Sequence, residues 1–298
     1  MAISAQQVKA LRDKTGAGMM DCKKALAECD GDEQAAVDWL RQKGIAKAAK
    51  RADRTASEGL IAFVGNDAQT TASMVEFKCE TDFVSKSDKF QDVGKMLGDA
   101  VAASDLSAAT PTAVPQAFLD APRDGGSLMD KVNDLIAVIG EAIQIGRFVK
   151  LAVDGAGVLG TYVHSTGKIG VVVEVTCANA ATAATEGMKE LAKNLAMQVA
   201  AANPLCVSPS ELPQDVLDRE KAVYRQQTLE EGKPENIVDK IVDGRVKKYY
   251  KEVCLLEQPY IREDKKSVAD LVKETGKALG DTLTVTRFVR LQLGAEEA

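Results

Sequence analysis

The strongest constraint on the fold is an internal repeat, because residues 59–151 and 158–292 carry the same pattern. Each copy opens with two short apolar runs separated by polar residues and glycine, which is typical of a strand, a hairpin loop and a second strand. The matching runs are 60–64 with 159–163 at an offset of 99, and 75–79 with 173–177 at an offset of 98. The two predicted hairpin loops therefore differ in length by one residue.

Each hairpin is followed by apolar residues at a 3-4-4 spacing, which places them on one face of a helix. These positions are Phe90, Val93, Leu97 and Val101 in the first copy, and Met188, Leu191, Leu195 and Val199 in the second. A third strand is predicted at residues 147–151 and 287–291. The sequence thus predicts an α+β fold with a duplicated hairpin-helix-strand core, divided into residues 56–154 and 155–298.

The two copies differ where the second strand meets the helix. The first has Glu80-Thr81-Asp82-Phe83-Val84, whereas residues 178–182 read Ala-Asn-Ala-Ala-Thr. One interpretation is that Asp82 caps the following helix and Phe83 packs it onto the sheet. The other is that both side chains insert into another protein. Because the second copy makes the same transition without an acid or an aromatic residue, we prefer the second interpretation.

Composition excludes several classes of function. The net charge of −6 and pI of about 5.1 argue against direct binding to nucleic acid, which needs clustered basic residues. No apolar run reaches the roughly 18 residues that span a bilayer, and no secretory signal is visible, so we expect a cytoplasmic protein without membrane contact. The scattered cysteines suit reduced, packed thiols. One basic run is interpreted as a solvated connecting helix; it contains Lys43, Lys47, Lys50, Arg51 and Arg54.

Residues 1–55 are predicted to form a three-helix docking domain with a basic linker. Ser4-x-x-Gln7 is a capping box, Gly16 and Gly18 end the first helix, Asp21 begins the second, and Asp32 caps the third. The paired methionines Met19 and Met20 are either a small core plug or an adaptable surface for a partner. We prefer the surface.

The segment between helix and third strand differs between the copies. Residues 104–127 of the first copy contain three prolines and a Gly-Gly pair and predict a loose connection. The second copy is longer, and residues 212–258 predict an inserted antiparallel helical hairpin that projects as an arm. Gly232-Lys233-Pro234 forms its turn, Val216 and Val223 mark the apolar face of one helix, and Val238, Val242, Val246, Tyr249 and Val253 that of the other.

Residues 155–160, Gly-Ala-Gly-Val-Leu-Gly, match the dinucleotide-binding fingerprint, but its third glycine should open a helix. Here it opens a predicted strand, so the segment is interpreted as a flexible linker in which alanine at Gly157 or Gly160 is tolerated. Cys79, His164 and Asp82 could be imagined as a catalytic triad. We reject it because Cys79 has a counterpart in Cys177 and His164 belongs to the other copy. No cofactor, no metal and no catalysis are expected.

Residues 11–26 and 81–86 resemble the two signatures of the bacterial elongation factor Ts family. The resemblance implies a ubiquitin-associated-like helical domain and an exchange factor, not an enzyme, that releases GDP from elongation factor Tu. The implied partner is bound in both its GDP-bound and its nucleotide-free state. The resemblance further implies that Thr81, Asp82, Phe83 and Val84 dislodge the Mg²⁺ of the partner, and that Arg12, Met19, Met20, Lys23 and His164 bind it. The alternatives are a chaperone-like adaptor and a dinucleotide enzyme.

Overall fold

Two antiparallel sheets form the centre of the molecule in the computed structural model, which describes residues 3–49, 51 and 53–295. In the first sheet the order is β1-β2-β4-β3, made of Glu58–Gly65, Thr71–Cys79, Ile143–Ala152 and Ala108–Ala113. In the second the order is β5-β6-β9, made of Gly157–Val163, Ile169–Cys177 and Leu283–Gln292. Both predicted hairpins are therefore present, and each predicted third strand pairs with the second strand of its hairpin.

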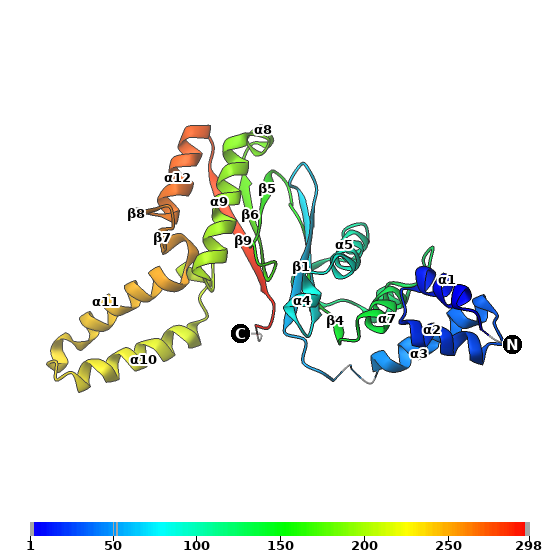
Figure 1. Cartoon of the computed structure of the whole chain (residues 1–298). Helices are drawn as coiled ribbons and strands as arrows, with labels where there is room; N and C mark the ends of the chain where they lie inside the picture. The colour runs from blue at the N-terminus through cyan, green and yellow to red at the C-terminus, as the bar shows by residue number, and fades with distance from the viewer. Residues whose placement is uncertain (1–2, 50, 52, 296–298) are drawn as a thin grey trace.

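The two sheets pack face to face, and helices cover the outer face of each (Figure 1). Ile61, Met74 and Val149 of the first sheet share one buried cluster with Val172 and Leu291 of the second. The first sheet carries α5 (Asp88–Ala102) and α7 (Leu128–Ile139), and the second carries α9 (Glu186–Ala202) and α12 (Val268–Leu279). The result is a helix-sheet-sheet-helix arrangement.

The repeat extends to a buried ion pair in each sheet. Arg147 on β4 binds Glu76 on β2 through Nη2 at 2.5 Å, and Arg287 on β9 binds Glu174 on β6 through Nε at 2.6 Å. Both carboxylate side chains are 3% exposed, and each lies where the register between its two strands shifts. A buried carboxylate without a partner would lower the free energy of unfolding by several kcal/mol. Each arginine therefore stabilises the buried glutamate on the neighbouring strand.

Each copy contains a second long helix that was not predicted from the sequence. Helices α7 and α12 start with capping boxes formed by Ser127 with Asp130 and by Ser267 with Asp270. Both end at a glycine in the left-handed region, Gly140 at φ 86° and Gly280 at φ 69°. The repeated unit is therefore a hairpin, a one-turn helix, two longer helices and a strand.

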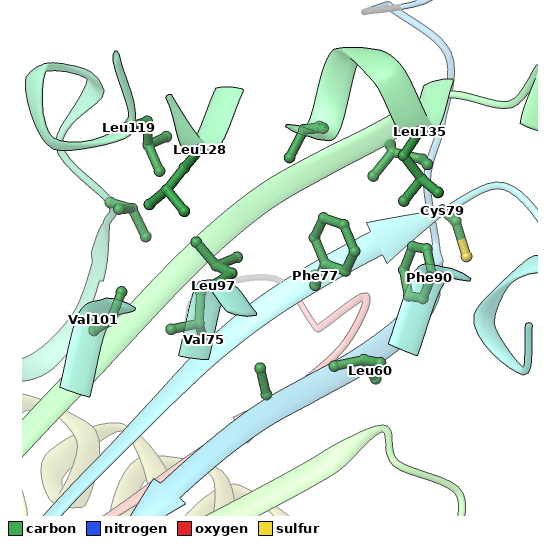
Figure 2. Close-up of a cluster of buried hydrophobic side chains, with 14 of the residues drawn as sticks. Leu60, Val75, Phe77, Cys79, Phe90, Leu97, Val101, Leu119, Leu128 and Leu135 are labelled. Atoms are coloured by element: carbon green, nitrogen blue, oxygen red, sulfur yellow. The ribbon is translucent and has the colours of Figure 1, made fainter. Parts of the chain in front are cut away.

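The prediction of a loose connection over residues 104–127 is wrong. This segment contains the edge strand β3 and the short helix α6 (Gln116–Asp120). Leu119 of α6 enters the core of the first copy beside Leu128 of α7, and Phe77 and Phe90 stack in the same core with ring centroids 4.3 Å apart (Figure 2). Pro111 is tolerated in β3 because an edge strand needs only half of its backbone donors.

The interpretation of residues 155–160 as a flexible linker is wrong for residues 157–160, whereas Gly155 and Ala156 do lie in the connection between β4 and β5. Gly157 and Gly160 lie within β5, and a Cβ on Gly160 would lie 2.0 Å from the carbonyl oxygen of Ala192 on α9. A Cβ on Gly157 would lie 2.6 Å from the carbonyl oxygen of Val175. Both glycines therefore allow close backbone approach, and alanine is not expected to be tolerated at either position.

The chain begins with α1 (Ala5–Thr15), α2 (Met19–Glu28) and α3 (Glu33–Ala49), which share one small core. The predicted capping box at Ser4 is present, but α2 begins at Met19 and not at Asp21. Helix α3 packs against α7, where Arg41 pairs with Asp130. Lys50 and the side chain of Lys47, two members of the predicted basic run, lie outside the described residues. None of the described helices is long and apolar enough to cross a membrane.

The predicted arm is formed by α10 (Gln214–Glu230) and α11 (Glu235–Val253), and it extends away from the two sheets (Figure 1). Val238, Val242 and Val246 are buried against α10, as predicted. Val223 was wrongly assigned to the packed face, since it is 43% exposed, and Leu217 and Tyr224 occupy that position. Two short elements, β7 (Pro259–Tyr260) and β8 (Glu263–Ser267), lead back to α12. The domain boundaries at residues 55/56 and 154/155 lie between elements, and the division into domains stays a prediction.

Candidate docking site

The tip between β2 and α5 is a single helical turn, α4 (Asp82–Ser85), that presents Phe83 to solvent. The Phe83 side chain is 84% exposed, whereas Val84 beside it packs against the core of the first copy. The helix is capped by Thr81, whose hydroxyl accepts the Val84 backbone N–H at 3.4 Å. The interpretation in which Asp82 caps the helix and Phe83 packs on the sheet is therefore wrong.

Asp82 forms an ion pair with Lys86, the residue that follows α4, whose Nζ lies 2.7 Å from the Asp82 carboxylate. The hydrogen bond and the positive charge of Lys86 lower the pKa of Asp82, and Asp82 in turn raises the pKa of Lys86. The carboxylate is half exposed. It is thus charged at neutral pH and accessible to a partner, beside an aromatic side chain that is also exposed.

Two acids fix the base of the tip to the segment between α7 and β4. Glu141 accepts the backbone N–H of Thr81 at 3.0 Å and its hydroxyl at 2.6 Å. Glu80 accepts the backbone N–H of Ala142 at 2.6 Å and binds Arg54 at 3.3 Å. The bond from Ala142 and the charge of Arg54 lower the pKa of Glu80. Charge-assisted bonds of this kind are stronger than neutral ones and hold the turn in one orientation.

The second copy repeats the same attachment without the exposed side chains. Asp281 accepts the backbone N–H groups of Ala178 and Asn179 at 3.2 and 3.0 Å. A one-turn helix follows, α8 (Ala180–Ala183), in the position of α4. Even the strand-end thiols match, since Cys79 and Cys177 both donate at 3.2 Å to the carbonyl of the residue two positions on. The scaffold is duplicated, and only the first copy carries Asp82 and Phe83.

The structure brings His164 to the same groove as Asp82. His164 begins the β5–β6 turn, and its Nδ1 lies 2.9 Å from the hydroxyl of Thr166. This turn meets β1 through a 2.8 Å bond from the Ile61 N–H to the Gly167 carbonyl. The resulting groove of about 650 Å³ is lined on one side by Asp82, Lys86 and β1, and on the other by residues 163–168.

The other predicted contact residues lie on the N-terminal helices. Arg12 on α1 and Lys23 on α2 are exposed, and Met19 and Met20 are 47% and 75% exposed in the first turn of α2. The core-plug interpretation of the methionines is therefore wrong. These four residues belong to a surface separate from the groove that holds Asp82 and His164.

Sequence reasoning missed Glu141 and the part played by Arg54. Glu141 lies 60 residues from Thr81 and follows a helix that was not predicted. A signal existed, because the offset of 140 that relates Arg147 to Arg287 also relates Glu141 to Asp281.

Cys79 is unsuited to catalysis, since burial raises the pKa of its thiol to about 12. Among the described residues, no group of three His, Cys, Asp or Glu could hold a metal ion.

An exposed aromatic residue on a fixed tip, beside a groove between two copies of one unit, is typical of an α+β protein that docks on another protein. Comparison with known proteins assigns the chain more closely. The family model described as Elongation factor TS matches residues 80–295. The chain belongs to the elongation factor Ts family and is a translation elongation factor.

Similar proteins cover the chain from end to end. Elongation factor Ts of Nitratidesulfovibrio vulgaris strain DP4 is 53% identical over 299 residues, covering 100% of this chain and 98% of the relative. The protein of the same name from Desulfovibrio desulfuricans is 51% identical, covering 99% of both chains. That from Lawsonia intracellularis is 49% identical, covering 99% of this chain and 100% of the relative.

Proposed function

We propose that this protein is the guanine nucleotide exchange factor of elongation factor Tu and releases GDP from it without a nucleotide site of its own. The observation that carries the proposal is the exposure of Phe83 on a turn held by Glu80 and Glu141. Leaving a phenylalanine side chain in water forgoes the roughly 1.5–3 kcal/mol that its burial contributes, and insertion of Phe83 into a partner would recover that free energy.

The proposed mechanism is insertion of the tip near the Mg²⁺ site of the partner. A GTPase holds GDP through backbone donors around the phosphates and through Mg²⁺, which bridges protein and phosphate oxygens. Phe83 separates the elements that carry the metal ligands, with Thr81 and Val84 fixing its direction. The charged carboxylate of Asp82 competes for the donors and cations that face GDP. Loss of Mg²⁺ then weakens the bound nucleotide.

Thermodynamic linkage sets what the docking surfaces must do. If this protein weakens the binding of GDP to its partner by some factor, it must bind the nucleotide-free partner more tightly than the GDP-bound partner by the same factor. Binding free energy from surfaces remote from the nucleotide can supply this difference. In the proposal, Arg12, Met19, Met20 and Lys23 anchor the N-terminal helices on the GTPase domain, and His164 contacts another domain. GTP then binds the released site, in the cytoplasm where translation takes place.

The test is release of fluorescent GDP from elongation factor Tu, chased with excess unlabelled GDP, with and without this protein. We expect the release rate to rise with protein concentration and to saturate, and the combined Asp82→Ala and Phe83→Ala variant to lose most of the acceleration. A protein that binds elongation factor Tu yet leaves the release rate unchanged would support the adaptor instead. Saturable binding of NAD to this protein alone would support the dinucleotide enzyme.

A further inference from the structure

The base of the arm is closed by a short parallel pairing of two distant segments. The N–H of Leu205 donates to the carbonyl of Val253 at 2.8 Å, that of Leu255 to Cys206 at 2.9 Å, and that of Leu256 to Val207 at 3.0 Å. This pairing brings the chain that enters α10 beside the chain that leaves α11. Everything between them is the arm.

The pairing sets two thiols directly opposite each other. Cys206 and Cys254 form the bridge between the two segments, and their Sγ atoms lie 3.6 Å apart. Neighbouring strands have a backbone separation of about 4.7–4.9 Å, which falls within the roughly 4.4–6.8 Å between Cα atoms that a disulfide needs. The two sulfur atoms have to approach each other by about 1.5 Å to reach the disulfide bond length.

Three of the other four cysteines donate to backbone carbonyls. The Sγ atoms of Cys79 and Cys177 donate to backbone carbonyls at 3.2 Å, and that of Cys22 donates to the carbonyl of Ala17 at 3.6 Å. In the arm pair, Cys254 is fully buried and Cys206 is 8% exposed. Apolar residues enclose both thiols, including Leu212, Val216 and Tyr249. An attacking reagent therefore reaches Cys206 first.

We propose that Cys206 and Cys254 are a modification site at which a low-molecular-weight disulfide oxidises the two thiols to one intramolecular disulfide. The Cys206 thiolate attacks the reagent, forms a mixed disulfide and releases one reagent thiol. The Cys254 thiolate then attacks Cys206 Sγ and expels the second. Two protein thiols lose two electrons and two protons, and one reagent disulfide becomes two thiols.

The surroundings set the order and the slow rate of this exchange. Burial raises the pKa of both thiols, to about 12 for Cys254, while the neighbouring Cys254 lowers the pKa of Cys206. Cys206 is the more accessible of the two thiols, so it reacts with the reagent first. The product closes a covalent loop from residue 206 to residue 254 that contains both arm helices. Such a crosslink restricts the unfolded chain and opposes fraying at the base of the arm.

The test is incubation of the whole protein with oxidised glutathione at mildly alkaline pH, followed by mass spectrometry of an unreduced digest. We expect a linked pair of peptides that contain Cys206 and Cys254, without a retained glutathione. Amide hydrogen exchange at residues 205–207 and 253–256 should slow, and the melting temperature should rise and fall back on reduction. Cys254→Ser should trap one glutathione on Cys206, whereas Cys206→Ser should leave Cys254 as a free thiol.

Cys177→Ser is the matched control, because it removes a thiol from outside the arm and should leave the 206–254 bridge intact. The proposal is overturned if both arm thiols stay reduced when Cys29 or Cys177 has already reacted. It is equally overturned if each arm thiol carries its own glutathione and no bridge forms. Neither result depends on nucleotide exchange, so the outcome is independent of the proposed function.

Discussion

Glu141 binds Thr81 across 60 residues of sequence, accepting its backbone N–H at 3.0 Å and its hydroxyl at 2.6 Å. Thr81 caps the turn that carries Phe83, so the direction of the aromatic side chain depends on an acid after α7. The equivalent acid in the second copy, Asp281, holds a turn with no exposed aromatic residue. Substitution of Asp281 is therefore a control for substitution of Glu141, because it loosens an equivalent turn that carries no exposed aromatic residue.

Glu141→Ala should lower both stability and exchange. Removing one charged acceptor of two hydrogen bonds costs about 1.5–3 kcal/mol of unfolding free energy, and the loosened tip should slow exchange by about tenfold. Asp281→Ala removes the matching acceptor and should cost similar stability while its folded fraction exchanges at the parent rate. Urea unfolding and fluorescent GDP release measure the two effects. Equal slowing by both variants would mean that Glu141 acts only through stability.

Phe83→Ala should slow nucleotide exchange without lowering the stability of the free protein. Truncating an aromatic anchor costs about 2 kcal/mol in the complex, so GDP release should slow by about 30-fold. The free protein should change by no more than about 0.5 kcal/mol, because the side chain is 84% exposed. Ile261→Ala is the control, since Ile261 is also exposed, at 48%, and lies away from the tip. A large loss of stability with normal exchange would show that Phe83 serves folding alone.

Local patterns were sufficient to predict the hairpins and the arm, because strands and amphipathic helices leave a periodicity that one copy confirms in the other. They were insufficient for β3, an edge strand of alanine, threonine and proline. This strand forms because it pairs with β4, and its own residues do not favour a strand. The helices α7 and α12 were not predicted, although Ser127-x-x-Asp130 and Ser267-x-x-Asp270 are capping-box patterns that indicate a helix start.

The site was predicted where side chains adjoin in sequence and missed where they meet through the fold. Asp82 and Phe83 stand out because the second copy lacks both. Their attachment to Glu141, and the groove shared with His164, depend on contacts between elements far apart in the chain. Likewise, Gly160 looked like part of a linker because no pattern in β5 shows that α9 lies directly over it.

Gly160→Ala should destabilise the second copy. The added methyl group would lie 2.0 Å from the carbonyl oxygen of Ala192, so α9 must move away from β5 at a cost of about 3 kcal/mol or more. Gly244→Ala is the control. That exposed glycine lies within α11 with no atom within 4 Å of the added group, and alanine there should stabilise by up to about 1 kcal/mol. If the urea midpoint of Gly160→Ala equals or exceeds that of the parent, then α9 does not pack against β5 as closely as the structure shows.

Glu80 should make stability depend on acid pH. The N–H of Ala142 and the charge of Arg54 lower the pKa of Glu80 in the folded state below its ordinary value of about 4.3. The unfolded state therefore binds the proton more readily than the folded state. The contribution of Glu80 is fully present above the unfolded pKa and is lost as the pH falls through the lower, folded pKa.

The measurement is urea unfolding of the parent and of Glu80→Gln at a series of pH values between about 6 and about 2. The parent should lose stability more steeply than Glu80→Gln as the pH falls below about 4.3, because only the parent has this carboxylate to protonate. Glu186→Gln removes one carboxylate from a side chain that is 90% exposed, and serves as the control for the change in net charge. An NMR titration of Glu80 gives the folded pKa directly. A value at or above the ordinary one, or the same slope in parent and Glu80→Gln, would show that the bond from Ala142 does not hold the base of the tip.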